Sequence, residues 1–158
     1  MRRRDVLTLF GCVPIAWPLA AGAEQSERMR RVGILYGTSA DDEESQARNA
    51  AFLKALQDRG WTNGRNVQIE TRWAAGDPDR ISKFAAEFAA LAPDVVFATG
   101  TGTVAALLHA TRTVPIVFCS VPDPVGAGFV DSLAKPGGNA TGLMVYDYSL
   151  GGKWLDLL

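Results

Sequence analysis

Apolar and polar positions along this chain follow two periods, one typical of strands and one typical of helices. Short runs rich in branched and aromatic residues occupy 31–36, 94–99 and 116–120. Their almost continuous apolar character is typical of strands buried on both faces. The segment 67–73 instead alternates apolar and polar residues, which predicts a strand with one covered face near a sheet edge. A fifth short strand is expected at 141–145.

Amphipathic segments separate these strands and predict three helices. The first covers 45–59 and carries its apolar residues on one side. The second begins at Asp77-Pro78, an N-cap followed by proline at the first helical position, and its apolar stripe reaches Leu91. The third follows Gly100.

The alternation of strands and helices predicts an α/β fold with a doubly wound, Rossmann-like parallel sheet. With the half-covered strand at an edge, the strand order is 2-1-3-4-5, and the topological switch point lies between the first and third strands. Ligands of such sheets bind beyond the carboxyl ends of the strands. Within the irregular stretch 121–142 we also expect a short helical piece at 129–133.

The first 23 residues have the features of an export signal. Arg2 to Arg4 form a positive segment, 6–19 is mostly apolar, and Ala21-Gly22-Ala23 is a small-residue cleavage site. The arginine pair also resembles a twin-arginine signal, so both general and twin-arginine export routes stay open. The alternative is an internal start at Met29. With the signal, the protein is expected in the periplasm.

Composition excludes several classes of function. The net charge of −1 carries no basic excess that would favour nucleic acid. The single histidine, His109, and the absence of paired cysteines or metal-binding motifs predict no metal site. No catalytic motif is present, and the protein is expected not to be an enzyme. The acidic run 41–44 is interpreted as a solvated helix cap, and Cys119 as a small buried hydrophobe.

The turn between the third strand and the third helix is the strongest candidate for a binding site. Its backbone N–H groups, two threonine hydroxyls and the positive end of the helix dipole suit a carboxylate or phosphate. The alternative is a plain turn with Thr101 as N-cap and no ligand. The other strand ends converge on the same crevice. The candidate ligand-binding residues are Tyr36, Gly37, Thr38, Ser39, Gly100, Thr101, Gly102, Thr103, Ser120, Asp123 and Tyr146.

The same turn also matches a nucleotide-binding fingerprint. Residues 100–105 read G-x-G-x-x-A, and Asp123 follows about twenty residues later. An exported oxidoreductase that binds a nicotinamide dinucleotide is therefore an alternative function. Against it, the fingerprint belongs in the first strand–helix turn of its domain, and Asp123 lies beyond the end of its strand, between Pro122 and Pro124.

Seven blocks of sequence, in order along the chain, resemble the bacterial ABC-transporter substrate-binding proteins of the tryptophan/tyrosine-type family. They are 31–36, 60–70, 72–77, 91–96, 110–118, 123–134 and 136–142. The resemblance implies the first lobe of a two-lobed, type I periplasmic binding protein. It also implies a small-molecule ligand such as an amino acid, an ABC permease in the inner membrane as partner, and no cofactor.

The resemblance also implies a division of the chain and roles for the candidate residues. Residues 24–148 correspond to the first lobe, and 149–158 to the start of a helix that leads to a missing second lobe, so the chain is interpreted as truncated. We hypothesise that Thr101 and Thr103 hold a ligand carboxylate and that Asp123 pairs with its ammonium group. The first loop closes the pocket, and one of the candidate tyrosines contacts the ligand side chain. A fragment with no independent activity remains an alternative.

Overall fold

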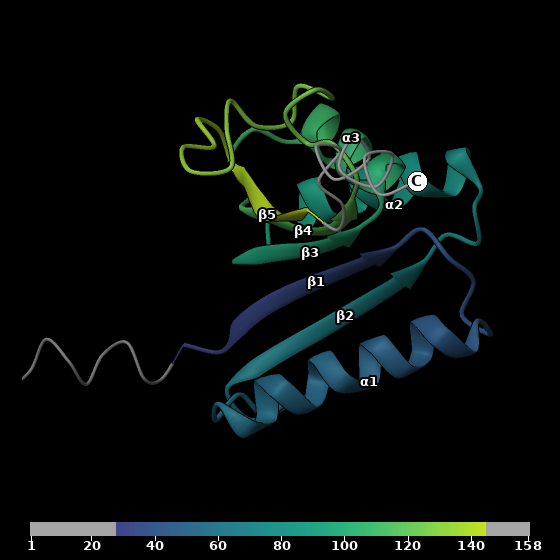
Figure 1. The fold of residues 1–158 in the computed structure, drawn as a ribbon. Helices are drawn as coiled ribbons and strands as arrows, with labels where there is room; N and C mark the ends of the chain where they lie inside the picture. Colours follow the sequence, from purple (N-terminus) through teal and green to yellow (C-terminus); the bar gives the residue numbers. More distant parts are fainter. Residues whose placement is uncertain (1–27, 145–158) are drawn as a thin grey trace, which may run out of the picture.

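The computed structural model describes residues 28–144, which form a single five-stranded sheet with helices on both faces (Figure 1). The elements are β1 (Arg30–Tyr36), α1 (Glu43–Asp58), β2 (Val67–Trp73), α2 (Pro78–Leu91), β3 (Val95–Thr99), α3 (Thr101–Ala110), β4 (Ile116–Val121) and β5 (Ala140–Met144). The predicted signal at 1–23, Tyr146 and the predicted helix at 149–158 lie outside the described residues.

All five strands are parallel, and their order is β2-β1-β3-β4-β5. This confirms the predicted doubly wound sheet, including the edge position of β2. Tyr36, the last residue of β1, pairs with Trp73 of β2 on one side and with Thr99 of β3 on the other. The carboxyl ends of β1, β2 and β3 therefore finish level with one another at one edge.

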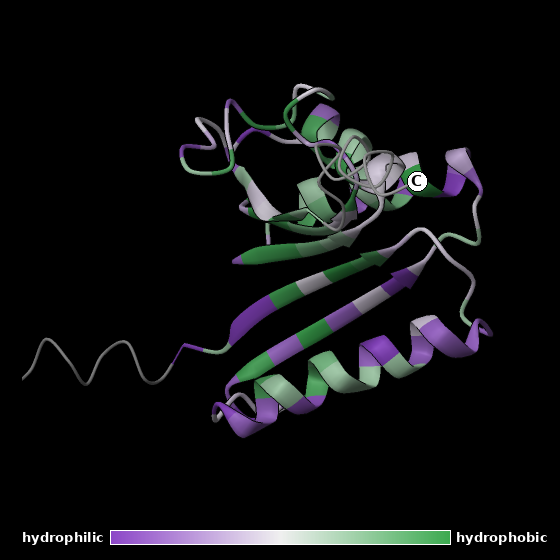
Figure 2. Cartoon of the chain, viewed as in Figure 1, coloured by the Kyte–Doolittle hydropathy of each residue, from purple (hydrophilic) through white to green (hydrophobic). Residues whose placement is uncertain are grey.

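The main apolar core lies between the sheet and the helices α2 and α3. Leu35, Val96 and Phe118 are buried on this face and pack with residues of both helices. Gly33 allows the close approach of α2, because a Cβ at this position would lie 2.7 Å from Cε1 of Phe88. Figure 2 shows that β3, β4 and α3 are largely hydrophobic, as expected of elements in the middle of a two-sided fold.

Within residues 28–144, α1 is the helix that covers the opposite face of the sheet, and it lies over β1 and β2 (Figure 1). Phe52 of α1 stacks on Phe97 of β3 with ring centroids 4.6 Å apart. The Tyr36 hydroxyl donates to Oδ1 of Asn49 over 3.2 Å. Figure 2 shows that α1 alternates hydrophilic and hydrophobic residues, which is the pattern of a helix with one solvent-exposed side.

The first two helices begin at the capping residues that the sequence suggests. The side chain of Asp42 accepts the N–H of Ser45 at the start of α1, so the acidic run 41–44 is a helix cap, as predicted. Hydrogen bonds from the side chain and the backbone N–H of Ser45 hold the pKa of Asp42 below its usual value. Asp77 caps α2, with Pro78 in the first turn, which is also as predicted.

Two local expectations were wrong. The N-cap of α3 is Gly100, with φ 88°, and Thr101 is already helical. Only glycine adopts this conformation without strain, so the chain can turn sharply into the helix. Residues 129–133 contain bends and no helix, and the N–H of Phe129 donates back to the carbonyl of Pro124 over 2.9 Å instead of starting a helical turn. Between residues 28 and 144, no helix is long and apolar enough to cross a membrane.

The end of α2 gives a test of the backbone geometry. Ala92 adopts a left-handed conformation, with φ 44°, while its N–H donates to the carbonyl of Phe88. We predict that Ala92→Gly raises the free energy of unfolding by roughly 0.5–1 kcal/mol, because glycine has no Cβ to oppose positive φ. Ala90→Gly, at an exposed position inside the same helix, is the control and should cost about 1 kcal/mol. Urea denaturation measures both; equal destabilisation would contradict the assigned conformation.

Candidate functional site

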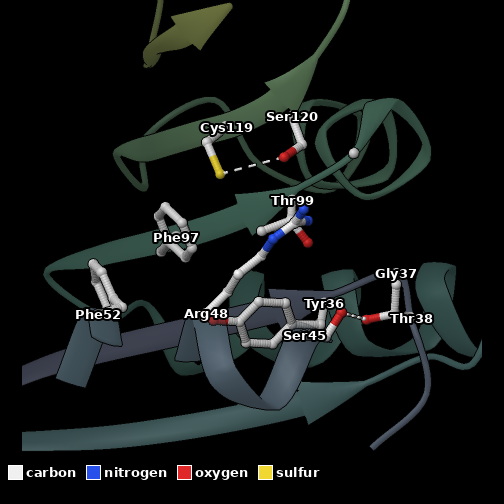
Figure 3. Close-up of a pocket in the computed structure, with 11 residues that line it drawn as sticks. Tyr36, Gly37, Thr38, Ser45, Arg48, Phe52, Phe97, Thr99, Cys119 and Ser120 are labelled. Carbon is white, nitrogen blue, oxygen red and sulfur yellow. Dashed lines mark hydrogen bonds between the residues drawn. The ribbon is translucent and has the colours of Figure 1, made fainter. Parts of the chain in front are cut away.

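A cavity of about 430 Å³ lies at the carboxyl ends of β1, β3 and β4, between the sheet and α1 (Figure 3). Its lining residues are Tyr36, Gly37, Thr38, Ser45, Arg48, Phe52, Phe97, Thr99, Gly100, Cys119 and Ser120. β1 and β3 are the neighbours at which the chain reverses its direction across the sheet. The cavity therefore lies at the topological switch point, where doubly wound sheets bind their ligands.

Five residues predicted from the strand ends line this cavity together. They are Tyr36 at the end of β1, Gly37 and Thr38 in the loop after it, Gly100 after β3, and Ser120 in β4. The turn at 100–103 and the first loop lie at the same edge of the sheet, as the hypothesis required. A Cβ placed on Gly37 would lie 3.5 Å from Cγ2 of Thr103.

The remaining residues of the predicted turn do not line the cavity. Thr101 and Gly102 are exposed in the first turn of α3. Thr103 is buried, and its hydroxyl donates to the carbonyl oxygens of Thr99 (2.8 Å) and Gly100 (2.9 Å). The hydroxyl of Thr103 therefore braces the turn from below, and its role as a ligand donor remains an untested prediction.

Ser39 and Asp123 are also engaged within their own loops. The Ser39 hydroxyl donates to the carboxylate of Asp41. Asp123 is exposed, and its Oδ1 accepts the N–H of Gly126 over 2.7 Å. Neither residue lines the cavity. Their proposed ligand contacts stay predictions, and Tyr146 lies outside the described residues.

Six lining residues were missed by sequence reasoning, and half of them belong to α1. Ser45, Arg48 and Phe52 are separated by three and four positions, which brings them onto one side of a helix. This spacing could have revealed them from the sequence, because it places a polar and a charged residue on the same side of the helix as the apolar residue Phe52. The other three, Phe97, Thr99 and Cys119, alternate along β3 and β4, and only the register of the sheet brings them beside Tyr36.

The first loop of the cavity is fastened to the loop that follows β2. The N–H groups of Ala74, Ala75 and Gly76 donate to the carbonyl oxygens of residues 36–38 over 2.6–3.0 Å. In addition, the Thr38 hydroxyl donates to the Ser45 hydroxyl oxygen of α1 over 2.8 Å. The loop is therefore held from two sides by hydrogen bonds, one set to the loop after β2 and one to α1.

Tyr36 forms the floor of the cavity next to β2. Its ring stacks on Trp73 with centroids 4.2 Å apart, and it meets Phe97 edge to face at 6.4 Å. Burial, followed by the Coulombic effect of the neighbouring Cys119, raises the pKa of Tyr36 to about 12. At neutral pH the hydroxyl is therefore protonated and donates to Asn49.

In the part of the chain that the structure describes, Arg48 is the only charged residue that lines the cavity. It projects from α1 into the space between Tyr36 and Thr99 (Figure 3). Its Nη2 lies 2.5 Å from Oε1 of Glu44, one helical turn earlier, and both side chains are largely exposed. Over residues 28–144, no group of three or more His, Cys, Asp or Glu side chains could hold a metal ion.

Comparison with known proteins gives this geometry a context. A family model described as ABC transporter substrate binding protein matches residues 30–157 of the chain. The chain belongs to this family. This confirms the resemblance that the seven sequence blocks carried, and the observed fold agrees with it. The substrate-binding proteins to which the chain is similar are longer than it is.

Among individual relatives, the chain is 39% identical over 95 residues to a tyrosine-binding protein of Clostridioides difficile (strain R20291). This match covers 60% of the chain and 28% of the relative. A ligand-free, open substrate-binding protein with adhesive properties from Clostridium difficile superposes with a TM-score of 0.70 at 31% identity. The superposition covers 81% of the present chain and 43% of the other.

Two further solved structures are similar. A conserved domain protein from Vibrio cholerae has a TM-score of 0.71 at 32% identity, with 82% of this chain and 43% of that chain covered. The ABC domain from Streptococcus pneumonia in complex with L-Trp has a TM-score of 0.64 at 26% identity, with 73% and 38% covered. The chain thus spans less than half the length of the relatives and structures that it matches.

Ser120 provides a test of strain at the cavity. It has φ 58°, and the pairing of β4 with β5 is irregular between Phe118 and Val121. A residue other than glycine with this backbone conformation destabilises the folded state by about 1–2 kcal/mol, and it persists where the surrounding structure requires it. We predict that Ser120→Gly raises the melting temperature by about 2–4 °C over Ser120→Ala. Both variants lose the hydroxyl, so a thermal melt compares the strain relieved in the glycine variant with the greater entropy of its unfolded chain, which offsets part of the gain. Identical melting temperatures would contradict the strained conformation.

Proposed function

We propose that this chain is a ligand-binding lobe of an exported ABC solute-binding protein that takes up an amino acid or a similar small molecule. The observation that carries the proposal is the cavity at the switch point, lined from β1, β3, β4 and α1. Its volume of about 430 Å³ suits a small ligand. Family membership supports a role in binding, since substrate-binding proteins hold a solute without converting it.

The relatives support an aromatic amino acid as the ligand. One similar protein is named for tyrosine, and one similar structure contains L-Trp. In this chain, Tyr36, Phe52 and Phe97 supply aromatic rings at the cavity. Such rings pack well against an aromatic ligand, and the polar groups at the strand ends can orient its charged groups.

The proposal includes a second lobe, a membrane partner and export. In a two-lobed protein the carboxyl edge of this sheet faces the other lobe, and closure buries the ligand between them. The ligand would then pass to an ABC permease in the inner membrane. The signal predicted at 1–23 supports export to the periplasm. A test of the arrangement is whether the coding DNA continues, in frame or after one frameshift, into a second α/β lobe.

The nicotinamide alternative rests on the glycine pattern at 100–105, and the observations at Asp123 and in the family comparison favour the binding function instead. Asp123, the acidic residue required to bind the ribose, instead accepts the N–H of Gly126 in its own loop. The glycine pattern follows the third strand, as the sequence indicated, and the family model describes a substrate-binding protein. We therefore retain the binding function.

Cys119 allows binding to be measured at the cavity itself. Its half-buried thiol lines the cavity. We predict that L-tyrosine or L-tryptophan slows alkylation of Cys119 by N-ethylmaleimide about tenfold at a ligand concentration ten times the Kd. Mass spectrometry of the Cys119 peptide gives the rate.

The control is the same reaction in denaturant, where the amino acids should not protect Cys119. If calorimetry detects binding but Cys119 is not protected from alkylation, the ligand binds elsewhere than in this cavity. If neither amino acid binds, the proposed ligand class is wrong.

A further inference from the structure

We infer that this lobe selects a planar apolar ligand through one anionic group, and that it does not use an ammonium group on the ligand. The preferred class is aromatic carboxylic acids, including those without an amino group. The inference rests on the proposed binding function and narrows its ligand class. It departs from the hypothesis that Asp123 pairs with an ammonium group, and it is carried by the charges around the cavity.

The first observation is the guanidinium of Arg48. It is the only charged group that residues 28–144 contribute to the lining, and the Tyr36 hydroxyl beside it is neutral at physiological pH. A guanidinium has five N–H donors in a rigid fork that matches a carboxylate. Glu44 accepts from Nη2 of Arg48, and no bond from Nη1 or Nε of Arg48 is found within residues 28–144. Because both partners of this pair are largely exposed, it constrains Arg48 only weakly.

The second observation is where the neighbouring carboxylates are directed. Of the residues that line the cavity in the described part of the chain, none is Asp or Glu. Asp42 accepts the N–H of Ser45 as the cap of α1, and Asp41 accepts the hydroxyl of Ser39. Asp123 accepts the N–H of Gly126. Glu44 lies outside the lining and is held by Nη2 of Arg48. An ammonium group inside the cavity would therefore meet a guanidinium and no carboxylate of the lining, which is unfavourable.

The third observation is the shape of the apolar wall. The Phe52 and Phe97 rings stack with 13° between their planes, and Tyr36 meets Phe97 edge to face. These rings and the guanidinium come from α1 and the neighbouring strands β1 and β3, so one ligand can contact both. A flat aromatic body with a carboxylate satisfies both surfaces, and the amino group of an amino acid adds nothing on this side.

The decisive experiment compares three ligands on the complete 158-residue chain, with protection of Cys119 from alkylation as the readout. The ligands are L-tryptophan, indole-3-propionate, which lacks the amino group, and tryptamine, which lacks the carboxylate. We expect half-protection by indole-3-propionate at a concentration within about threefold of that for L-tryptophan, and no protection by tryptamine. This comparison needs no variant.

A second arm tests the role of Arg48. Arg48→Gln should raise the half-protecting concentration of both acids by about tenfold or more, because a hydrogen bond to a charged group is lost. Arg48→Lys keeps the charge without the fork and should give a smaller loss. Lys54→Gln is the matched control, since Lys54 forms the corresponding exposed pair with Asp58 on the same helix. It should leave protection unchanged, and circular dichroism checks the fold of each variant.

The outcomes separate this inference from the proposed function. If L-tryptophan protects and indole-3-propionate does not, the inference is overturned while the binding function stands. Protection by tryptamine, or equal losses in the Arg48 and Lys54 variants, also overturns it. If neither acid protects Cys119, both the inference and the proposed aromatic ligand fail.

Discussion

The parallel alignment of β1, β3 and β4 is the constraint on which the rest of the molecule depends. Tyr36 and Thr99 are register partners, and Thr99 pairs with Cys119, so the last residues of β1 and β3 lie beside a residue near the end of β4. A parallel ladder requires each strand to return through a crossover, which leaves the loops at the carboxyl ends close together. The strand side of the cavity follows from this geometry, and α1 adds Ser45 and Arg48 from the other side.

One face of the sheet carries the apolar core, and the other carries the cavity. α2 and α3 cover one face with a dense apolar core, and Gly33 lets Phe88 approach the sheet closely. The other face carries α1 over β1 and β2, and the cavity occupies the space between α1 and the neighbouring strands. Core packing on one face thus supports a site on the other, which can hold polar groups without interrupting the main core.

The site combines tightly held groups with one weakly paired, exposed side chain. The first loop is tied by backbone hydrogen bonds to residues 74–76, Tyr36 is clamped against Trp73, and Ser120 holds an unfavourable backbone conformation at the strand end. Arg48, in contrast, lies on an exposed helix face with a weak partner. A fixed aromatic and backbone frame beside one weakly held cation suits the proposed role of orienting a small ligand.

The periods of the sequence by themselves determined the parallel sheet, its strand order and the edge at which the cavity lies, because burial on one or two faces imposes distinct apolar patterns. They also identified Tyr36 and Gly100 at that edge. Tertiary structure alone decided which side chains reach the cavity. Arg48 enters because of how α1 lies across the sheet, whereas Asp123 is turned aside by a hydrogen bond within its loop. Local pattern specifies which residues belong to an element, but the direction of a polar side chain depends on the partners that distant segments bring to it.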